Sequence, residues 1–360
     1  MSRLARLLLV SASLAPLRAA VLTDRPIIGI LTVPTSDGAE GCVTRRRRRL
    51  ASDSSSPTAT SSCFHSYYVD WLESAGARVV AIPCTAPPAL LDDLFDSVNG
   101  VLFTGGEESL ATNSTYYGAA RRLFDRAVAA AATGDRVPIW GSCMGFQLLC
   151  LLASGDDQSV LTRDEYASEG LMLPLDLVQP AASSSRLLGS ASAADAAGDG
   201  AIRARVVNIL ASENVTVNFH HDGVDPARFA DPASPLGAFF ELLSTNTDAD
   251  GRAFASTIEA RGLADDATRS ATPPIFGAQW HPERPPFEWT LHEPAPGITH
   301  TAHAILASQY AAAAFVAEAR GNAHAFPSVD AENANLVYGA TPMWLSDEYG
   351  SSEQVYVYDA

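Results

Sequence analysis

One cysteine stands in a sequence context typical of a catalytic nucleophile. Cys143 is the centre of Gly141-Ser-Cys-Met-Gly145, between an apolar run at 137–140 and a longer one at 146–153. The first run is too short for a helix and predicts a buried strand, whereas the second has helical length. A strand, a tight turn and a helix form a nucleophile elbow. The start of a helix favours the thiolate, the reactive form of cysteine. The alternative is a buried, inert cysteine on a core strand.

A cysteine nucleophile needs a base within hydrogen-bond reach, and His281 is the best candidate. It follows a mostly apolar run at 275–280, so it too should emerge at the end of a strand. Glu283 lies two residues further on, and residues i and i+2 share a face of an extended chain. Glu283 could therefore orient the imidazole. The alternative is a structural histidine beside an unrelated glutamate, because geometry and not spacing defines a catalytic triad.

The elements that must position these residues alternate along the chain. Apolar runs predict strands at 25–33, 78–83 and 98–103, and further segments predict helices at 67–76, 90–95, 117–132 and 300–317. Strands that alternate with helices imply an α/β fold, a three-layer sandwich with a mostly parallel central sheet. Sites in such sheets lie at the carboxyl ends of strands, where both Gly105-Gly106 and Cys143 are expected.

The central part of the chain has a weaker pattern. Residues 181–201 are rich in Ala, Ser, Asp and Gly and predict a flexible insertion. Strands are expected at 203–210, 215–219, 238–243 and 254–259, and the polar residues 244–251 predict a turn between the last two.

A second insertion is expected near residues 40–62, where five consecutive arginines at 45–49 precede a Ser/Thr-rich linker. Like charges repel one another and stay solvated, which favours a disordered loop. A processing site and a patch that binds an anionic ligand are the functional alternatives.

Composition and charge limit the classes of partner. The formal net charge is −17, and an acidic surface attracts neither nucleic acid nor an anionic membrane. Residues 1–20 combine early arginines, an apolar run and small residues, which is the layout of a signal peptide; a frayed cytosolic N-terminus is the alternative. We therefore expect a secreted, vacuolar or lysosomal protein without membrane insertion. The sequons at Asn113 and Asn214 could then carry glycans, or they are chance matches.

The apolar fraction of 47% is ample for the core of one large α/β domain. The chain has five cysteines, at positions 42, 63, 84, 143 and 150, and their spacing is not that of metal ligands. If Cys143 is a free nucleophile, some of the other four could pair in an oxidising compartment.

Taken together, these motifs resemble a known family. Gly-x-Cys-x-Gly after a strand, an earlier Gly-Gly at a strand end and a late Gln-Trp-His-Pro-Glu resemble the class I glutamine amidotransferase-like group. Within that group the chain is similar to the gamma-glutamyl hydrolases of peptidase family C26. The matching stretches are 25–31, 68–83, 99–106, 138–146, 218–220, 244–248 and 277–289. The extension to Trp289 and the leader favour the hydrolases over amidotransferases that serve a synthase.

The resemblance implies a thiol mechanism. Cys143 would attack the carbonyl of a gamma-glutamyl amide and form a thioester. His281 would act as base and then as acid, and Glu283 would orient it. The backbone N–H groups of Gly106 and Met144 would form the oxyanion hole, because fixed donors supply much of the catalysis in acyl transfer.

The resemblance also implies the substrate and the domain organisation. Gly105, Gln147 and His220 would contact the substrate, a folylpoly-gamma-glutamate, and no metal or organic cofactor is needed. The hydrolase domain would span 24–326, with residues 327–360 as a C-terminal extension packed on it, and a homodimer is possible. The chain departs from the family near 40–62 and 181–201, and at His221-Asp222-Gly223.

Three other functions stay open. The same chemistry could act on another gamma-glutamyl conjugate. A glutaminase module that hands ammonia to a synthase would need a partner domain, and the chain has no Gly-rich ATP-binding loop. A non-catalytic binding relative would be expected to have lost the cysteine or the histidine, and both are present.

Overall fold

A central sheet of eight strands organises the part of the chain that the structure describes. The computed structural model describes residues 21–35, 61–189, 200–261, 273–289, 298–344 and 354–358. In spatial order the strands are β4 (Arg78–Ile82), β1 (Ile27–Leu31), β5 (Gly100–Phe103), β6 (Ile139–Ser142), β14 (Ile275–Ala278), β13 (Ala253–Ala260), β12 (Phe240–Thr247) and β9 (Asp176–Leu177). The pairs from β4 to β14 are parallel and those from β14 to β9 are antiparallel, which confirms a mostly parallel sheet.

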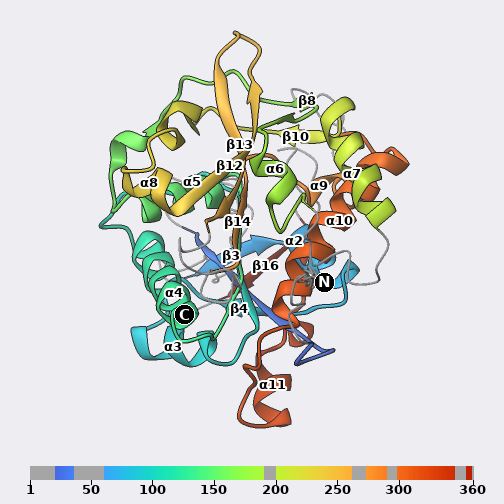
Figure 1. Ribbon diagram of the computed structural model, residues 1–360. Coiled ribbons are helices and arrows are strands. Elements are labelled where there is room, and N and C mark those ends of the chain that lie inside the picture. The colour runs from blue at the N-terminus through green and yellow to red at the C-terminus, as the bar shows by residue number, and fades with distance from the viewer. Residues whose placement is uncertain are drawn as a thin grey trace, which may run out of the picture.

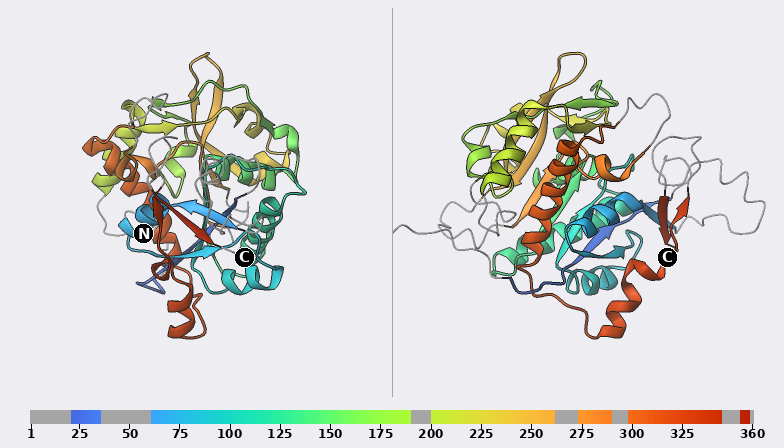
Figure 2. Two further views of the ribbon diagram at one scale, coloured as in Figure 1. Left: turned by 180° about the vertical axis from the view of Figure 1, so that it is seen from behind. Right: turned by 90° about the vertical axis from the view of Figure 1, so that its right-hand side faces the viewer.

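Helices cover both faces of this sheet (Figure 1 and Figure 2). One core contains side chains of α3 (Pro88–Phe95), α4 (Thr115–Ala131) and α5 (Met144–Ala153). The core on the opposite face contains side chains of α2 (Ser66–Ser74), α6 (Ala181–Ser184), α7 (Gly200–Ser212) and α10 (Ala302–Ala319). The strands are buried on both faces, which explains why they read as continuous apolar runs and not as alternating ones. The three-layer α/β architecture is confirmed.

Shorter elements surround the sheet. Two small sheets pair β10 (Thr216–Asn218) with β8 (Leu171–Leu173) and β11 (Gly223–Val224) with β7 (Leu161–Thr162). A third has the order β15 (Met343–Trp344), β16 (Gln354–Tyr358), β3 (Ser62–His65) and β2 (Val33–Pro34). The remaining helices are α8 (Pro235–Phe239), α9 (Arg284–Phe287) and α11 (Val329–Asn335), with 3-10 turns η1 (Gln158–Val160), η3 (Pro226–Phe229) and η4 (Val337–Gly339). Cys63 is in a disulfide, whereas Cys84, Cys143 and Cys150 are free and buried.

The prediction of a strand at 203–210 is wrong, because this segment lies within the helix α7. Its β-branched residues suggested a strand. The residues that become buried are Val206, Ile209 and Leu210, which have the i, i+3, i+4 spacing of one helix face. Packing of this face in the core beside α10 decides the conformation.

The prediction of a flexible insertion is wrong for residues 181–189. Residues 181–184 form α6, and the buried Arg186 pairs with the buried Glu259 of β13, with 3.1 Å between Nε and Oε1. The same carboxylate accepts the backbone N–H groups of Arg186 and Leu187. A buried charge that is paired and hydrogen-bonded fixes a segment whose composition alone suggests mobility. Residues 190–199 lie outside the described part of the chain.

The turn predicted at 244–251 is shorter than expected, because β12 continues to Thr247. The polar side chains of this strand are satisfied by the neighbouring strand: Ser244 Oγ donates to Thr257 Oγ1 (2.8 Å), and Asn246 Oδ1 accepts from Ser256 Oγ (2.6 Å). The turn itself begins at Asp248, whose carboxylate accepts the backbone N–H of Arg252 at 2.7 Å. The polar composition predicted a loop, but these polar side chains form hydrogen bonds with the neighbouring strand and are part of the sheet.

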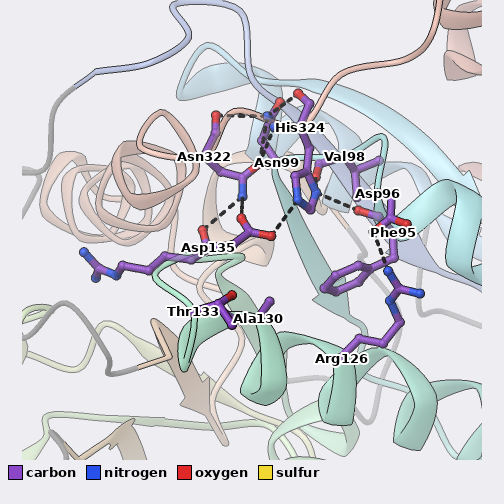
Figure 3. Close-up of polar contacts among 11 residues, drawn as sticks. Phe95, Asp96, Val98, Asn99, Arg126, Ala130, Thr133, Asp135, Asn322 and His324 are labelled. Carbon is purple, nitrogen blue, oxygen red and sulfur yellow. Dashed lines mark hydrogen bonds and ion pairs between the residues drawn. The ribbon is translucent and has the colours of Figure 1, made fainter.

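A polar network built on the buried Asn99 and Asn322 joins the amino end of β5 to the segment that follows α10 (Figure 3). Asn99 accepts the Ile27 N–H at 2.8 Å and donates to the backbone oxygen of His324 at 2.9 Å. The side-chain amide of Asn322 donates to Asp135 Oδ1 at 3.0 Å. His324 Nε2 lies 2.9 Å from Asp135 Oδ2. This network anchors the end of the sheet that lies opposite the carboxyl ends of the parallel strands.

Several predictions concern residues outside the described part of the chain. These are the signal peptide at 1–20, the arginines at 45–49 and Cys42. Among the described residues, no helix has the length and apolar character needed to cross a membrane.

Candidate active site

Cys143 lies in a strained turn between β6 and α5. Its φ of 49° and ψ of −106° are rarely adopted by a residue other than glycine, and such strain is often found at active sites. The flanking glycines allow the turn to be this tight. A Cβ at Gly141 would lie 2.5 Å from the carbonyl oxygen of Gly145, and a Cβ at Gly145 would collide with the carbonyl oxygen of Phe103. The Gly-x-Cys-x-Gly pattern therefore follows from the close packing of α5 on the sheet.

His281 and Glu283 form a buried pair at the end of β14. His281 Nδ1 lies 2.6 Å from Glu283 Oε1, and the backbone N–H of His281 donates to the carbonyl of Val217 at 2.8 Å. A carboxylate at Nδ1 holds the proton on that nitrogen and leaves Nε2 as the basic one. A Cβ at Gly105 would lie 2.8 Å from His281 Cε1 and 3.3 Å from Cys143 Cβ. The structure thus brings the nucleophile and the base together beside Gly105.

Two residues of β6 hold the carboxylate in place. Ser142 Oγ donates to Glu283 Oε2 at 3.2 Å and accepts from Trp140 Nε1 at 3.0 Å. Both are fully buried, so this relay lies in a region of low dielectric where hydrogen bonds are strong. Sequence reasoning missed Ser142 and Trp140. The available signal was that Trp140 and Ser142 are two residues apart in the strand just before Cys143, which places both side chains on one face of the strand.

The predicted oxyanion donors come from two different elements, the segment after β5 and the start of α5. Gly106 follows β5 with a φ of +149°, a conformation that L side chains rarely adopt. Met144 is the first residue of α5, and its N–H interacts with the Cys143 sulfur and lowers the pKa of the thiol. Met144 Sδ accepts the backbone N–H of Glu108 at 3.1 Å, so the loop at 105–108 rests on this side chain.

The start of α5 favours the thiolate as predicted, because the N–H of Met144 lowers the pKa of Cys143, but burial outweighs this contribution. Burial raises the pKa of Cys143 to about 12, and Arg284 opposes this rise only in part. Burial, together with Arg284, also lowers the pKa of His281 below its ordinary value, despite Glu283. Burial raises the pKa of Glu283, but the attraction of His281 and Arg284 outweighs it and lowers the pKa overall. The resting site therefore holds a neutral thiol, a neutral imidazole and a carboxylate.

Sequence reasoning also missed Arg284, the cation beside the catalytic pair. Its guanidinium carbon lies 4.5 Å from the ring centroid of Phe219, a cation–π contact, and its Nε lies 3.2 Å from Glu288 Oε2. The carbonyl of Phe219 accepts from the Cys143 thiol at 3.7 Å. Arg284 therefore stabilises negative charge on the sulfur and opposes positive charge on His281. Its position directly after Glu283 was the only sequence signal.

The predicted substrate residues Gln147 and His220 belong to a hydrogen-bonded network that reaches the nucleophile. Gln147 Nε2 donates to the carbonyl of Asp222 at 2.9 Å and to Gln279 Oε1 at 3.3 Å. Gln279 Nε2 in turn donates to Cys143 Sγ at 3.7 Å. His220 Nδ1 donates to the same Asp222 carbonyl at 2.9 Å, and burial lowers its pKa to about 3. The buried Nε2 of His220 has no hydrogen-bond partner among the described residues, so it can accept one from a ligand.

An acidic depression lies next to the site. Its volume is about 430 Å³, and its lining includes His221 and four acidic residues, Asp164, Glu165, Glu169 and Asp250. Glu169 is close enough to Cys143 to raise the pKa of the thiol. The catalytic residues do not line this depression. It lies where the sequence departs from the resembled family, at His221-Asp222-Gly223.

Comparisons with known proteins agree with this geometry. The family model of peptidase C26 matches residues 42–283, which include Cys143, His281 and Glu283. The mouse gamma-glutamyl hydrolase (Mus musculus) is 35% identical over 81% of this chain and 82% of its own length. The human gamma-glutamyl hydrolase (Homo sapiens) is 33% identical over 81% of both chains. Gamma-glutamyl hydrolase 1 of Arabidopsis thaliana is 30% identical over 94% of this chain and 84% of its own length. The resemblance inferred from the sequence motifs is confirmed, and the chain belongs to the peptidase C26 family.

Proposed function

We propose that this protein hydrolyses gamma-glutamyl bonds with Cys143 as nucleophile and His281 as base. The observation that carries the proposal is the placement of a strained cysteine and a carboxylate-held histidine side by side at the carboxyl ends of β6 and β14. The peptidase C26 match and the gamma-glutamyl hydrolases among its relatives support the bond class.

The first half of the reaction forms a thioester. His281 Nε2 takes the thiol proton as the Cys143 sulfur attacks the gamma-carbonyl carbon, because the thiol is neutral at rest. The carbonyl oxygen becomes an oxyanion, which the N–H groups of Gly106 and Met144 stabilise. The intermediate collapses, the C–N bond breaks, and the imidazolium of His281 gives its proton to the leaving amine. Glu283 stabilises that imidazolium throughout.

The second half releases the gamma-glutamyl product. His281, neutral again, takes a proton from a water molecule that attacks the thioester carbonyl. The same two N–H groups stabilise the second oxyanion. The C–S bond breaks, the sulfur regains the proton from His281, and a free gamma-carboxylic acid leaves, which then gives its remaining proton to solvent. The burial of all three catalytic side chains keeps these charges in a medium where fixed dipoles act strongly.

We propose folylpoly-gamma-glutamates as the substrate. The names of the relatives support the gamma-glutamyl group, and the unpartnered Nε2 of His220 offers one acceptor for an amide N–H of such a chain. The acidic depression favours a second candidate, a gamma-glutamyl conjugate of an uncharged or cationic amine. Its four acidic residues would repel a long polyglutamate tail, because carboxylates at close range repel one another.

The test is gamma-glutamyl release from folate pentaglutamate by wild type and by Cys143→Ala. We expect the variant to lose several orders of magnitude in kcat/KM, as when a covalent nucleophile is deleted. Competition between the pentaglutamate and a gamma-glutamyl amine, each at the same concentration, separates the two substrate classes. Equal activity in wild type and Cys143→Ala would refute the mechanism.

We also propose that the protein follows the secretory route, from its N-terminal sequence and sequons, and that it forms a homodimer, from the family resemblance. Both sequon asparagines, Asn113 and Asn214, are exposed, which glycosylation requires. A mobility shift after glycosidase treatment of protein from a eukaryotic host would test the route. Light scattering on the purified chain would test the dimer.

A further inference from the structure

We propose that Tyr68 is a positioning residue for the oxyanion hole: its phenolic oxygen fixes Gly105, so that the next backbone N–H, that of Gly106, faces the substrate carbonyl. The proposal rests on the proposed hydrolase function and adds a residue to its machinery. Tyr68 acts through the loop and does not need to touch the substrate.

The contact between Tyr68 and the loop is direct. The backbone N–H of Gly105 donates to Tyr68 Oη at 2.7 Å, and Tyr68 is fully buried. Burial also raises the pKa of this phenol well above its ordinary value, so the oxygen stays neutral. A Cβ at Gly105 would lie 2.9 Å from Tyr68 Oη, 2.8 Å from His281 Cε1 and 3.3 Å from Cys143 Cβ. Tyr68 therefore meets the loop at the point where the loop passes the nucleophile and the base.

The loop needs an external support at this point. Gly105 and Gly106 have no side chains, and Gly106 adopts a φ of +149° that side chains would make costly. The N–H of Gly105 is already committed to Tyr68, so the N–H of Gly106 is the one that can serve the oxyanion. On the other side Met144 supports the loop through the Glu108 N–H. The loop is thus held at two points, one before and one after Gly106.

Tyr68 itself is held by elements that are far apart in the sequence. It lies on α2, which follows directly after β3. The C-terminal strand β16 pairs antiparallel with β3, and Figure 1 labels the two strands close together. Phe64 of β3 packs its ring 5.6 Å from that of Tyr356 and 5.7 Å from that of Tyr358. The end of the chain therefore helps to fix the helix that places the phenol.

The experiment compares Tyr68→Phe with Tyr310→Phe. Tyr310 is also buried and also makes a phenolic hydrogen bond, to the carbonyl of Leu187 at 3.0 Å, but it lies on α10. Two reactions are measured for each protein: hydrolysis of a gamma-glutamyl anilide, and alkylation of Cys143 by iodoacetamide, followed by mass spectrometry of its peptide. Hydrolysis passes through an oxyanion, whereas alkylation displaces iodide and forms none.

We expect Tyr68→Phe to lower kcat for the anilide by about 10- to 100-fold with little change in KM, the size of loss that a small misplacement of a catalytic group produces. Alkylation should stay within about threefold of wild type, and Tyr310→Phe should change neither reaction by more than that. Unchanged hydrolysis in Tyr68→Phe would overturn the proposal. Parallel losses of hydrolysis and alkylation would also overturn it, because the defect would then lie in the nucleophile.

A second variant covers the case in which Tyr68→Phe does not fold. Site-specific replacement of Tyr68 by 3-fluorotyrosine keeps the shape and makes the oxygen a poorer acceptor, so a fall of a few-fold in kcat is expected with alkylation unchanged. No fall would count against the positioning role. If the wild type fails to hydrolyse gamma-glutamyl amides, the proposed function falls and the role of Tyr68 falls with it. If the wild type hydrolyses the substrate and the Tyr68 variants match it, the proposed function stands and the role of Tyr68 is refuted.

Discussion

Two of the histidine–carboxylate pairs among the described residues lie at opposite ends of the parallel strands, and only one of these two lies beside a cysteine. His281 lies 2.6 Å from Glu283 at the carboxyl end of β14, and His324 lies 2.9 Å from Asp135 at the amino end of the sheet. At the second pair Nδ1 of His324 also faces the carbonyl oxygens of Phe95 and Val98, at 3.0 and 3.1 Å (Figure 3). Both ring nitrogens of His324 therefore serve the fold.

The two pairs differ in whether Nε2 of the histidine is hydrogen-bonded and in which side chain lies beside it. Glu283 is hydrogen-bonded to Nδ1 of His281. The other ring nitrogen of His281, Nε2, has no hydrogen bond to any described residue. Beside it lies a cysteine with a strained backbone. The His324 region holds two buried asparagines, Asn99 and Asn322, whose amide groups are hydrogen-bonded to the fold. Satisfied polar groups stabilise structure, whereas an open basic nitrogen beside a nucleophile can transfer a proton.

The strongest test of this comparison replaces each histidine by alanine. His281→Ala should lower kcat/KM for a gamma-glutamyl substrate by about 10³- to 10⁴-fold, because the proposed base is removed. His324→Ala should leave the turnover of folded protein within about threefold of wild type and should lower its thermal stability. Steady-state kinetics with urea unfolding separates the two effects. A comparable loss of turnover in both variants would refute the distinction.

The next test concerns pH. Neutral His281 is the active form, and burial and Arg284 hold its pKa below 6.5, so activity should persist to pH values below 6.5 and fall as the ring gains its proton. Glu283→Gln removes an anion that raises this pKa. We expect the acid limb of kcat/KM to move to lower pH and the plateau to fall by about 10- to 100-fold. A limb that moves to higher pH in this variant would contradict the assignment.

A substitution in the polar network at the amino end of the sheet should change the stability of the protein but not its catalytic rate. Asn99→Ala leaves the buried N–H of Ile27 and the carbonyl of His324 without their partner. We expect the free energy of unfolding to fall by roughly 2–4 kcal/mol, the cost of unsatisfied buried groups. Below the unfolding transition, kcat should equal that of wild type. A lower kcat with unchanged stability would show that this network acts on the catalytic site.

The smallest expected effect is a difference in stability between two variants of Cys143, and it measures the backbone strain at this residue. Cys143→Ala and Cys143→Gly both remove the sulfur, but only glycine adopts a φ of 49° with a ψ of −106° without strain. Cys143→Gly should therefore be more stable than Cys143→Ala by about 1 kcal/mol, the lower end of the cost of a strained residue. Urea unfolding of the two inactive variants measures this difference. Equal stability would show that the turn is not strained.

Local sequence allowed the parallel part of the sheet to be predicted well, and it selected Cys143, His281 and Glu283, which the structure brings together. Gly141 and Gly145 are needed because backbone packs against backbone at those positions, so their spacing carries structural information. Segment 203–210 was misassigned because residue types favoured a strand while packing favoured a helix. Segment 181–189 was misassigned because one ion pair, Arg186 with Glu259, orders a polar stretch. Both errors lie where contacts distant in sequence outweigh local preference.

The sequence by itself determined the alternating strands and helices of the parallel part of the sheet, the candidate nucleophile Cys143, and the family to which the chain belongs. Periodicity and glycine spacing are local properties, so they can be read without a structure. Only the tertiary structure decided that the thiol is neutral at rest, that Arg284 and Ser142 act on the triad, and that Tyr68 holds the loop at Gly105. These properties depend on burial and on distances between residues far apart in the chain, and neither is encoded in any short stretch of sequence.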